Sequence, residues 1–191
     1  RSYQGFTCLI QISSRTQDFI IDSIALRAEL GNHLRPVFTD PKKLKVLHGA
    51  NSDVVWLQRD FSLYLVNMFD TGQAARVLQL PGFGLAFLLQ KYCNVVADKK
   101  YQLADWRQRP LPAEMLKYAR EDTHYLLYIY DCIRKDLITE AAKKTSNEVT
   151  LLEQVHKKSN VLCLTTWEKP LVKDFNYHMI IQRQRIHSTD A

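Results

Sequence analysis

Residues 43–61 read KLKVLHGANSDVVWLQRDF, and this stretch decides the fold class. Its first part, 43–50, is a short apolar run that predicts a strand. Capping residues follow, and then apolar residues recur at helical spacing, so a helix is expected over 51–61. The next stretch, LYLVNMFDT (63–71), predicts a second strand, and Asp70 is expected to cap the helix after it. Strands that alternate with helices in this way are typical of an α/β protein.

The remaining elements extend this pattern on both sides. A hairpin is expected from strands at 6–13 and 18–23, and two helices at 24–38 and 84–95. A basic and aromatic loop follows at 98–112, and a long helix runs from about Pro112 to Ala142. The polar tail, 143–191, is expected to contain one or two shorter helices. Strands come first and alternate with helices, so we expect a mixed central sheet flanked by helices.

The composition is that of a globular chain with a basic excess. The 191 residues carry 26 Lys and Arg against 20 Asp and Glu, a formal net charge of +6. This charge favours a polyanionic partner such as nucleic acid. No apolar run approaches the length that crosses a bilayer, so no membrane partner is expected. The four cysteines are scattered without a Cys-x-x-Cys pair, which argues against a zinc site and favours a reducing compartment.

Three acidic residues stand at the ends of expected strands or inside the long helix: Asp53, Asp70 and Asp122. Functional sites of sheet-and-helix folds gather at strand ends, because the loops there converge on one edge. Each acid also has an ordinary structural explanation. Asp53 could stabilise a helix N-terminus, and Asp70 is better explained as a cap. Sequence alone leaves both explanations open for Asp53 and Asp122.

The stretch MLKYAREDTHYLLY (115–128) places a phenol and a carboxylate on one helix face. Tyr118 and Asp122 are four residues apart, so their side chains project within ~40° of each other. Their stripe continues toward apolar residues, so the carboxylate must be paired, hydrogen-bonded or metal-bound. Arg120 and His124 are possible partners in a purely structural role. Paired acids with a phenol would instead suit phosphodiester hydrolysis by two Mg²⁺ or Mn²⁺ ions.

Four blocks together resemble the ribonuclease D family, in the tyrosine subgroup of the DEDD 3′-to-5′ exonucleases. They are VLHGANSDVVWLQRDF, NMFDTGQAARVL, YQLADWRQRPLP and YAREDTHYLLYIYD, in the family's order. They look most like the branch that serves the eukaryotic nuclear RNA exosome. The resemblance covers about residues 1–140 and implies a ribonuclease H-like 3′-5′ exonuclease fold. It also implies that two divalent cations, Mg²⁺ or Mn²⁺, act as cofactors.

The resemblance implies a role for each catalytic candidate. Asp122 would bind metal directly, and Asp53 would help to hold the second ion, partly through water. Tyr118 would position the nucleophile, since a phenol with a pKa near ~10 is a poor base at neutral pH. Glu121, between them in sequence, falls outside the family's Tyr-x-x-x-Asp motif. The expected catalytic set is therefore Asp53, Tyr118 and Asp122.

Four further residues are candidates for substrate binding. The resemblance implies that Trp56 faces the terminal nucleotide and that Lys99 approaches its phosphate, which suits an aromatic face and a cation. The block ADWRQRPL adds Trp106 and Arg107 as an RNA-facing surface. Structural alternatives remain: Trp56 could be a core residue, Trp106 could pin its loop to the long helix, and Lys99 could lie in a solvated loop.

The family's first motif, an Asp-x-Glu pair on the opening strand, does not occur in the sequence. The resemblance would place it upstream of Arg1, so we expect the sheet to lack its first strand. With two site acids alone, the chain as it stands is expected to be nearly inactive. We expect an exonuclease domain over residues 1–142. Residues 143–191 are expected to form a helical linker toward an HRDC domain that the chain does not include.

The sequence thus predicts a 3′-5′ exoribonuclease domain that releases 5′-nucleotides from RNA 3′ ends in nuclear RNA and rRNA processing and decay. By resemblance, its partners are single-stranded RNA 3′ ends and nuclear exosome subunits. Its expected location is the nucleus, including the nucleolus. The alternative is a non-catalytic RNA-binding or exosome-associated module that keeps the fold and the basic surface. An Asp-x-Glu pair upstream of the chain would favour the enzyme.

Overall fold

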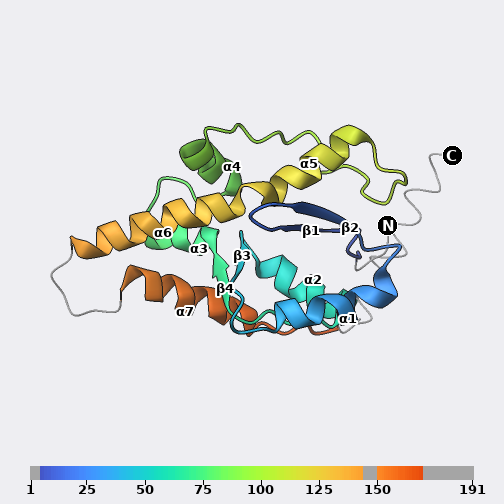
Figure 1. The fold of residues 1–191 in the computed structure, drawn as a ribbon, viewed down its shortest axis with the longest axis horizontal. Coiled ribbons are helices and arrows are strands. Elements are labelled where there is room, and N and C mark those ends of the chain that lie inside the picture. The colour runs from blue at the N-terminus through green and yellow to red at the C-terminus, as the bar shows by residue number, and fades with distance from the viewer. Residues whose placement is uncertain (1–4, 144–149, 170–191) are drawn as a thin grey trace, which may run out of the picture.

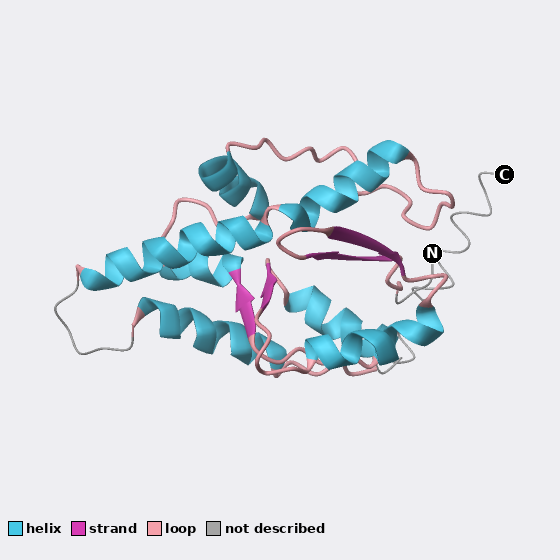
Figure 2. Ribbon diagram, in the orientation of Figure 1, coloured by secondary structure: helices cyan, strands magenta, loops and turns pink. Residues whose placement is uncertain are grey.

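The computed structural model describes residues 5–143 and 150–169. In chain order its elements are β1 (Leu9–Ser13), β2 (Asp18–Asp22), α1 (Arg27–Phe38), β3 (Lys45–Leu47), α2 (Asn51–Phe61), β4 (Met68–Asp70), α3 (Thr71–Val77), α4 (Leu85–Leu88), the π-helical turn η1 (Leu89–Cys93), α5 (Ala113–His124), α6 (Leu126–Ala142) and α7 (Leu151–Cys163). Figure 1 shows the β1–β2 hairpin between α5 and the α1–α2 pair. Figure 2 shows that helices make up most of the molecule and surround the short strands.

The strands form two pairs. β1 and β2 are antiparallel, with Ile10 opposite Ile21, so the predicted hairpin is confirmed. β3 and β4 are parallel, with Val46 opposite Phe69. The predicted α/β class, with antiparallel and parallel strands flanked by helices, is confirmed. Among the described residues the two pairs remain separate sheets, so β1 and β3 each have one edge without a strand partner there.

β4 is shorter than the strand predicted over 63–71. Only Met68–Asp70 pairs as a strand. The preceding segment follows the end of α1 instead, because the Val66 N–H donates to the Phe38 carbonyl at 3.0 Å. Asn67 then takes a left-handed conformation with φ 59°, which turns the chain into β4. A long-range contact and a backbone turn, rather than strand propensity, set this boundary.

The long helix predicted from Pro112 to Ala142 is two helices, and this prediction is wrong at Tyr125. That residue has φ −91° and ψ −7°, and it ends α5 before α6 begins. No Gly or Pro marks the break. α5 packs on the β1–β2 hairpin, whereas α6 packs on α3, α7 and β3, so the two halves follow different surfaces. No helix among the described residues is long and apolar enough to cross a membrane.

β4 lies between two hydrophobic clusters. Met68 packs into one cluster with residues of β1, α1 and α2, including Ile10, Leu30 and Val54. Its neighbour Phe69 points the other way, into a cluster with residues of α3, α6 and α7. Successive side chains of a strand point to opposite faces, so three residues of β4 serve both cores. β4 is therefore the central element of the fold.

Helix α7 covers the second edge of β4 with polar side chains. Ser159 Oγ accepts a hydrogen bond from the Asp70 N–H at 2.9 Å, and Asn160 Oδ1 accepts one from the Met68 N–H at 3.4 Å. Side chains thus satisfy donors that a fifth strand would otherwise satisfy. α7 shares the core with the segment before residue 142. The predicted division at that residue stays a prediction, and residues 170–191 of the predicted linker lie outside the described residues.

Removal of the Ser159 hydroxyl should destabilise the fold. Ser159→Ala leaves the buried Asp70 N–H without an acceptor, which costs about 1–3 kcal/mol. We expect a lower urea midpoint with an unchanged slope. Lys158→Ala, an exposed change one residue earlier on the same helix, is the control and should alter the free energy of unfolding by less than ~0.5 kcal/mol. Equal effects of the two substitutions would contradict this account of the β4 edge.

Candidate active site

The buried carboxylate of Asp70 fixes the start of two helices at the end of β4. Asp70 is 0% exposed. Its Oδ2 accepts a hydrogen bond from the Ala50 N–H at 2.7 Å, and its Oδ1 accepts one from the Gln73 N–H at 3.0 Å. The predicted cap of α3 is confirmed, and the same side chain also holds the N-terminus of α2. Asp53, in the first turn of α2, is thereby fixed in place.

A second polar contact joins the ends of β3 and β4. His48 Nδ1 lies 2.9 Å from Thr71 Oγ1, and that hydroxyl donates its hydrogen to the Leu47 carbonyl at 3.1 Å. Because a hydroxyl has a single hydrogen, Nδ1 must be the donor to Oγ1. Burial lowers the pKa of His48, which favours the neutral ring, and the contact with Thr71 places its hydrogen on Nδ1. The strand ends at this edge are therefore locked in one arrangement.

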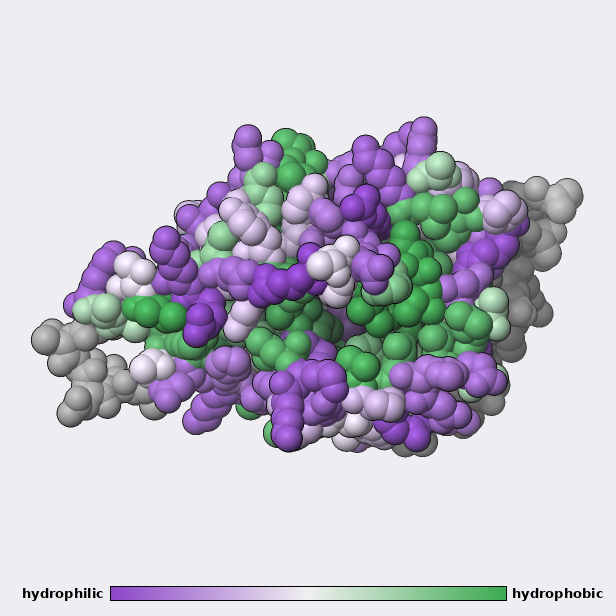
Figure 3. All heavy atoms as spheres, in the orientation of Figure 1, coloured by the Kyte–Doolittle hydropathy of each residue, from purple (hydrophilic) through white to green (hydrophobic). Residues whose placement is uncertain are grey.

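A groove of about 960 Å³ lies between the hairpin, β3, α2 and α5, and it contains most of the predicted site. Five of the seven predicted site residues line it, from three separate segments of the chain: Asp53, Trp56, Trp106, Tyr118 and Asp122. Its walls also include apolar residues of β1 and β3. Figure 3 shows apolar surface open to solvent on this face of the molecule, bordered by polar side chains. The fold thus brings together residues that are far apart in sequence.

Two carboxylates in the groove carry raised pKa values. Burial, and then the negative charge of Asp70, raise the pKa of Asp53. Burial, and then the charge of Glu121, raise the pKa of Asp122 to about 6. The Asp122 side chain is exposed to the open groove, so solvent moderates the effect of the walls around it. Both environments disfavour the ionised carboxylate and would favour a cation beside it.

Neither carboxylate has a basic partner within the described residues. The structural explanation for Asp122, an ion pair with Arg120 or His124, is wrong, because both side chains bind Asp18 instead. The described residues also contain no group of three or more His, Cys, Asp and Glu side chains that could hold a metal ion. They supply two acids to the groove, one from α2 and one from α5.

Tyr118 stands in an aromatic cluster beside Asp122. Its ring centroid lies 5.8 Å from that of Trp106 and 5.9 Å from that of Tyr101. Burial, and then the charge of Asp122, raise the pKa of its phenol. The phenol therefore keeps its hydrogen at neutral pH and is available as a donor, which agrees with positioning rather than with base catalysis.

The two groove tryptophans differ in their surroundings. Trp56 is 46% exposed, so the alternative that it is a core residue is wrong. Trp106 packs on Tyr118, as the alternative of a loop pinned to the helix requires, and it also lines the groove. An exposed indole in a groove offers a face on which an unstacked base could lie.

Lys99 and Arg107 lie outside the groove lining. Both side chains are exposed, and the Arg107 guanidinium makes two hydrogen bonds to Asp105, at 2.7 and 2.6 Å. Arg109, in the same loop, binds Asp22 and the Cys8 carbonyl, so it ties the loop to the hairpin. The substrate-binding role of Lys99 and Arg107 stays a prediction.

Sequence reasoning assigned no role to several polar residues that line the groove, among them His48 and Gln102. His48 directly precedes the Gly49 that ends the predicted strand, so its place at a strand end was a usable signal. Gln102 follows the basic part of the loop and has no such signal. Its position depends on how residues 98–112 pack over α5.

Comparison with known proteins identifies the family. A family model described as 3′-5′ exonuclease matches residues 1–138. The chain is 55% identical over 177 residues to Protein RRP6-like 2 of Arabidopsis thaliana, covering 93% of this chain and 20% of that protein. It is 51% identical over 187 residues to Exosome complex component 10 of Homo sapiens, covering 98% of this chain and 21% of the relative. The chain thus spans about a fifth of the length of these curated relatives.

Solved structures agree with the resemblance inferred from the motifs. The catalytic core of RRP6 from Trypanosoma brucei matches with a TM-score of 0.83 and 48% identity, over 95% of this chain and 48% of that one. RNase D of Escherichia coli, an exoribonuclease, matches with a TM-score of 0.69 and 25% identity, over 82% of this chain and 39% of that one. The predicted relationship to ribonuclease D and to the exosome exonuclease branch is confirmed.

The raised pKa of Asp122 predicts a pH-dependent effect on stability. Because the folded pKa of about 6 lies above the ordinary value of 3.8, the contribution of Asp122 is fully present below about pH 4 and is lost as pH rises through 6. Asp122→Asn removes this loss. Relative to the parent chain, the variant should therefore gain stability to urea between pH 4 and pH 8. Thr166→Ala, an exposed change that removes no titratable group, is the control and should show the same difference at pH 4 and at pH 8. A constant difference for Asp122→Asn would contradict the raised pKa.

Proposed function

The chain belongs to the 3′-5′ exonuclease family, and we propose that it forms the catalytic domain of an exoribonuclease that shortens RNA from its 3′ end. The products would be 5′-nucleotides, released by hydrolysis of the last phosphodiester. The observation that carries this proposal is the groove itself. It places two carboxylates that lack a basic partner in the described part of the chain, a protonated phenol and two indoles around one cavity.

The residues of the groove fit divalent cations in part. Two carboxylates with raised pKa values are hard oxygen donors, of the kind that Mg²⁺ and Mn²⁺ prefer. Asp122 would hold one ion directly, and Asp53 would help to hold a second. Two bound cations would supply activation of the attacking water and stabilisation of the leaving oxygen. The described residues contain no group of three or more possible metal ligands, and in this proposal further acids from outside them would complete the site.

The remaining groove residues would bind and orient the RNA end. Tyr118, with its hydrogen retained, would donate a hydrogen bond that orients the attacking water. Trp56 would stack on the terminal base, since its exposed indole lies one helical turn after Asp53. Trp106 would form a second aromatic wall. Lys99 and Arg107, exposed on the adjacent loop, would contact phosphates outside the groove.

The parent protein would act with the RNA exosome. One relative carries the name Exosome complex component 10, and the identity of 51% over 98% of the chain supports a shared role. We therefore propose that exosome subunits are its partners and that it works in the nucleus, including the nucleolus, on RNA and rRNA precursors. The chain spans about a fifth of that relative, so regions outside it would carry most contacts with the exosome.

Loss of the Asp122 carboxylate should abolish trimming. In a version of the protein that carries an Asp-x-Glu segment upstream, we expect Asp122→Asn to slow Mn²⁺-dependent shortening of a labelled oligoadenylate by about 10³-fold or more. Tyr118→Phe keeps the ring but loses the donor and should cost about 10–100-fold, as for other groups that orient a reactant or ligand. Single-turnover assays at saturating RNA would measure both rates.

The neighbouring Glu121→Gln is the matched control for Asp122→Asn, and it should stay within about threefold of the parent, since Glu121 does not line the groove. Mn²⁺-induced relaxation of groove resonances gives a second readout that needs no activity. It should disappear in Asp122→Asn and persist in Glu121→Gln. Full activity of Asp122→Asn would exclude this site as the reaction centre.

The 191 residues alone should be nearly inactive, because among the described residues only Asp53 and Asp122 supply acids to the groove. We expect this chain to bind single-stranded RNA without shortening it over hours in Mn²⁺. A fusion that adds the Asp-x-Glu strand of a relative should restore activity. If RNA is bound but the fusion also fails, the rival function gains support, namely a non-catalytic RNA-binding module. Rapid digestion by the chain alone would show that the two acids suffice.

A further inference from the structure

A second pocket lies beside the tip of the hairpin, outside the set of predicted site residues. It has a volume of about 620 Å³ and lies between the hairpin turn and the break that separates α5 from α6. Its lining includes charged and aromatic side chains from both regions: Arg15, Asp18, Arg120, His124, Tyr125 and Tyr128. Ser14 lines both this pocket and the groove, so the two cavities adjoin at the hairpin tip.

The Asp18 carboxylate accepts hydrogen bonds from three side chains at this pocket. Its Oδ2 accepts hydrogen bonds from Arg120 Nε at 2.6 Å and from His124 Nδ1 at 2.8 Å. Its Oδ1 accepts one from Ser13 Oγ at 2.7 Å. The Ser13 hydrogen bond, followed by those from Arg120 and His124, lowers the pKa of Asp18 to about 2. The carboxylate is therefore ionised at neutral pH, and its partners largely compensate its charge.

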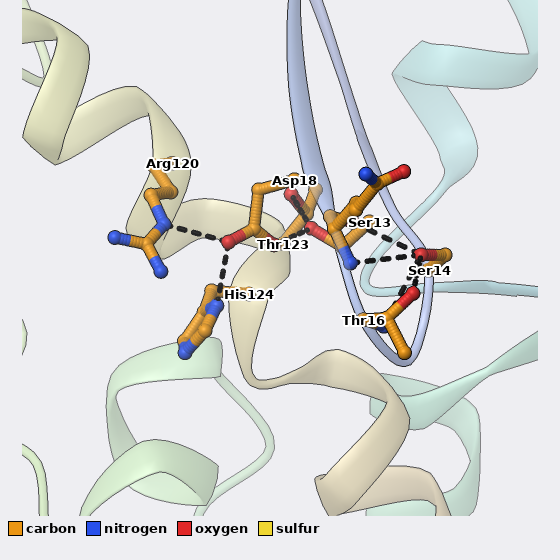
Figure 4. A network of polar contacts seen from close by, with 8 residues as sticks. Ser13, Ser14, Thr16, Asp18, Arg120, Thr123 and His124 are labelled. Carbon is orange, nitrogen blue, oxygen red and sulfur yellow. Dashed lines mark hydrogen bonds and ion pairs between the residues drawn. The ribbon is translucent and has the colours of Figure 1, made fainter.

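The outer ends of the two basic side chains stay available. Arg120 uses only Nε, so within the described residues its two terminal amino groups have no acceptor. His124 uses only Nδ1, which leaves Nε2 without a partner there. Figure 4 shows these free nitrogens on the side away from Asp18. Two parallel N–H donors of a guanidinium match two oxygens of a phosphate.

The other cation of the pocket is not available in this way. Arg15 directs both terminal amino groups to Asp131, with NH1 at 2.5 Å and NH2 at 3.0 Å. Asp131 is thereby compensated as well. Among the described basic side chains of the pocket, terminal guanidinium and ring nitrogens without an acceptor therefore belong to Arg120 and His124. Tyr128, which is 55% exposed, adds a ring beside them, and the Tyr125 ring packs at 85° to that of His124 with centroids 4.7 Å apart.

We propose that this pocket binds the phosphate of a nucleotide, with Arg120 as the anion ligand and the tyrosine rings beside the base. The chemistry is that of a phosphate ester that carries a planar ring, and free donors with aromatic faces are how proteins recognise it. If the proposed function holds, the nucleotide is an upstream residue of the RNA whose 3′ end lies in the groove. The chain would pass from one cavity to the other at Ser14.

Binding in EDTA tests this proposal without any catalysis. Fluorescence anisotropy would give the affinity of labelled oligoadenylates of three and of ten nucleotides. Arg120→Gln should weaken binding of the longer oligomer about tenfold and make its salt dependence shallower by about 0.7, the value for one lost phosphate contact with a single strand. Arg15→Gln removes the same charge from the same pocket, and it should change the affinity by less than twofold.

Two further measurements separate the sources of the phosphate. The side-chain resonances of His124 should shift on titration with the ten-nucleotide oligomer and not with the trimer if RNA is the ligand. If AMP alone produces the shift at millimolar concentration, the pocket takes a free nucleotide, and the proposal holds with that source. Both titrations are carried out on the chain without substitutions, so a folding defect in Arg120→Gln cannot produce the same result.

The proposal is overturned if Arg120→Gln and Arg15→Gln behave alike and neither RNA nor AMP shifts His124. Its failure is separable from failure of the proposed function. Asp122→Asn in the extended protein should lose cleavage but keep Arg120-dependent binding. If the chain binds RNA through Arg120 but does not cleave it, even with the Asp-x-Glu strand restored, the proposed function is contradicted and the proposal for the pocket is not.

Discussion

The burial of one charge, on Asp70, is the constraint on which the rest of the structure depends. A carboxylate with 0% exposure is expensive unless hydrogen bonds replace its lost water. Here the backbone N–H groups of Ala50 and Gln73 do so, and both belong to helix N-termini, whose partial positive charge favours an anion. This arrangement works only when α2, α3 and the end of β4 meet at one point. The positions of Asp53 and of both hydrophobic clusters follow from that meeting.

The Asp70 carboxylate also places negative charge beside the candidate site. Asp70 lies close enough to raise the pKa of Asp53, and Glu121 acts in the same direction on Asp122. A site made of acids without basic partners lowers stability at neutral pH, since the ionised forms are disfavoured in the folded chain. A fold that keeps such residues gains from any cation that binds between them. The same pair of unneutralised acids therefore lowers the free energy of unfolding at neutral pH and favours the binding of a cation.

Local signals in the sequence identified local features correctly. Helix α2 occupies 51–61 as predicted, and Asp70 caps α3, because spacing and capping chemistry decide both within a few residues. The break at Tyr125 could not be read in this way, because it depends on the surfaces that α5 and α6 each cover. The motif spacing placed Tyr118 and Asp122 on one face, and the groove contains both. The surroundings of Lys99 depend on loop packing and carried no local signal.

The contacts of the basic residues on α5 explain why neither of them pairs with Asp122. Arg120 and His124 flank it in sequence, and residues two apart on a helix project about 200° from each other, onto different faces. Asp18, more than 100 positions away in the chain, binds both cations on the other face. The hairpin acid therefore orients α5 and withholds from Asp122 the partners that would neutralise it. A carboxylate kept unpaired beside a groove is costly in a stable fold, and the Asp18 contacts, which also fix the hairpin against α5, help to offset that cost.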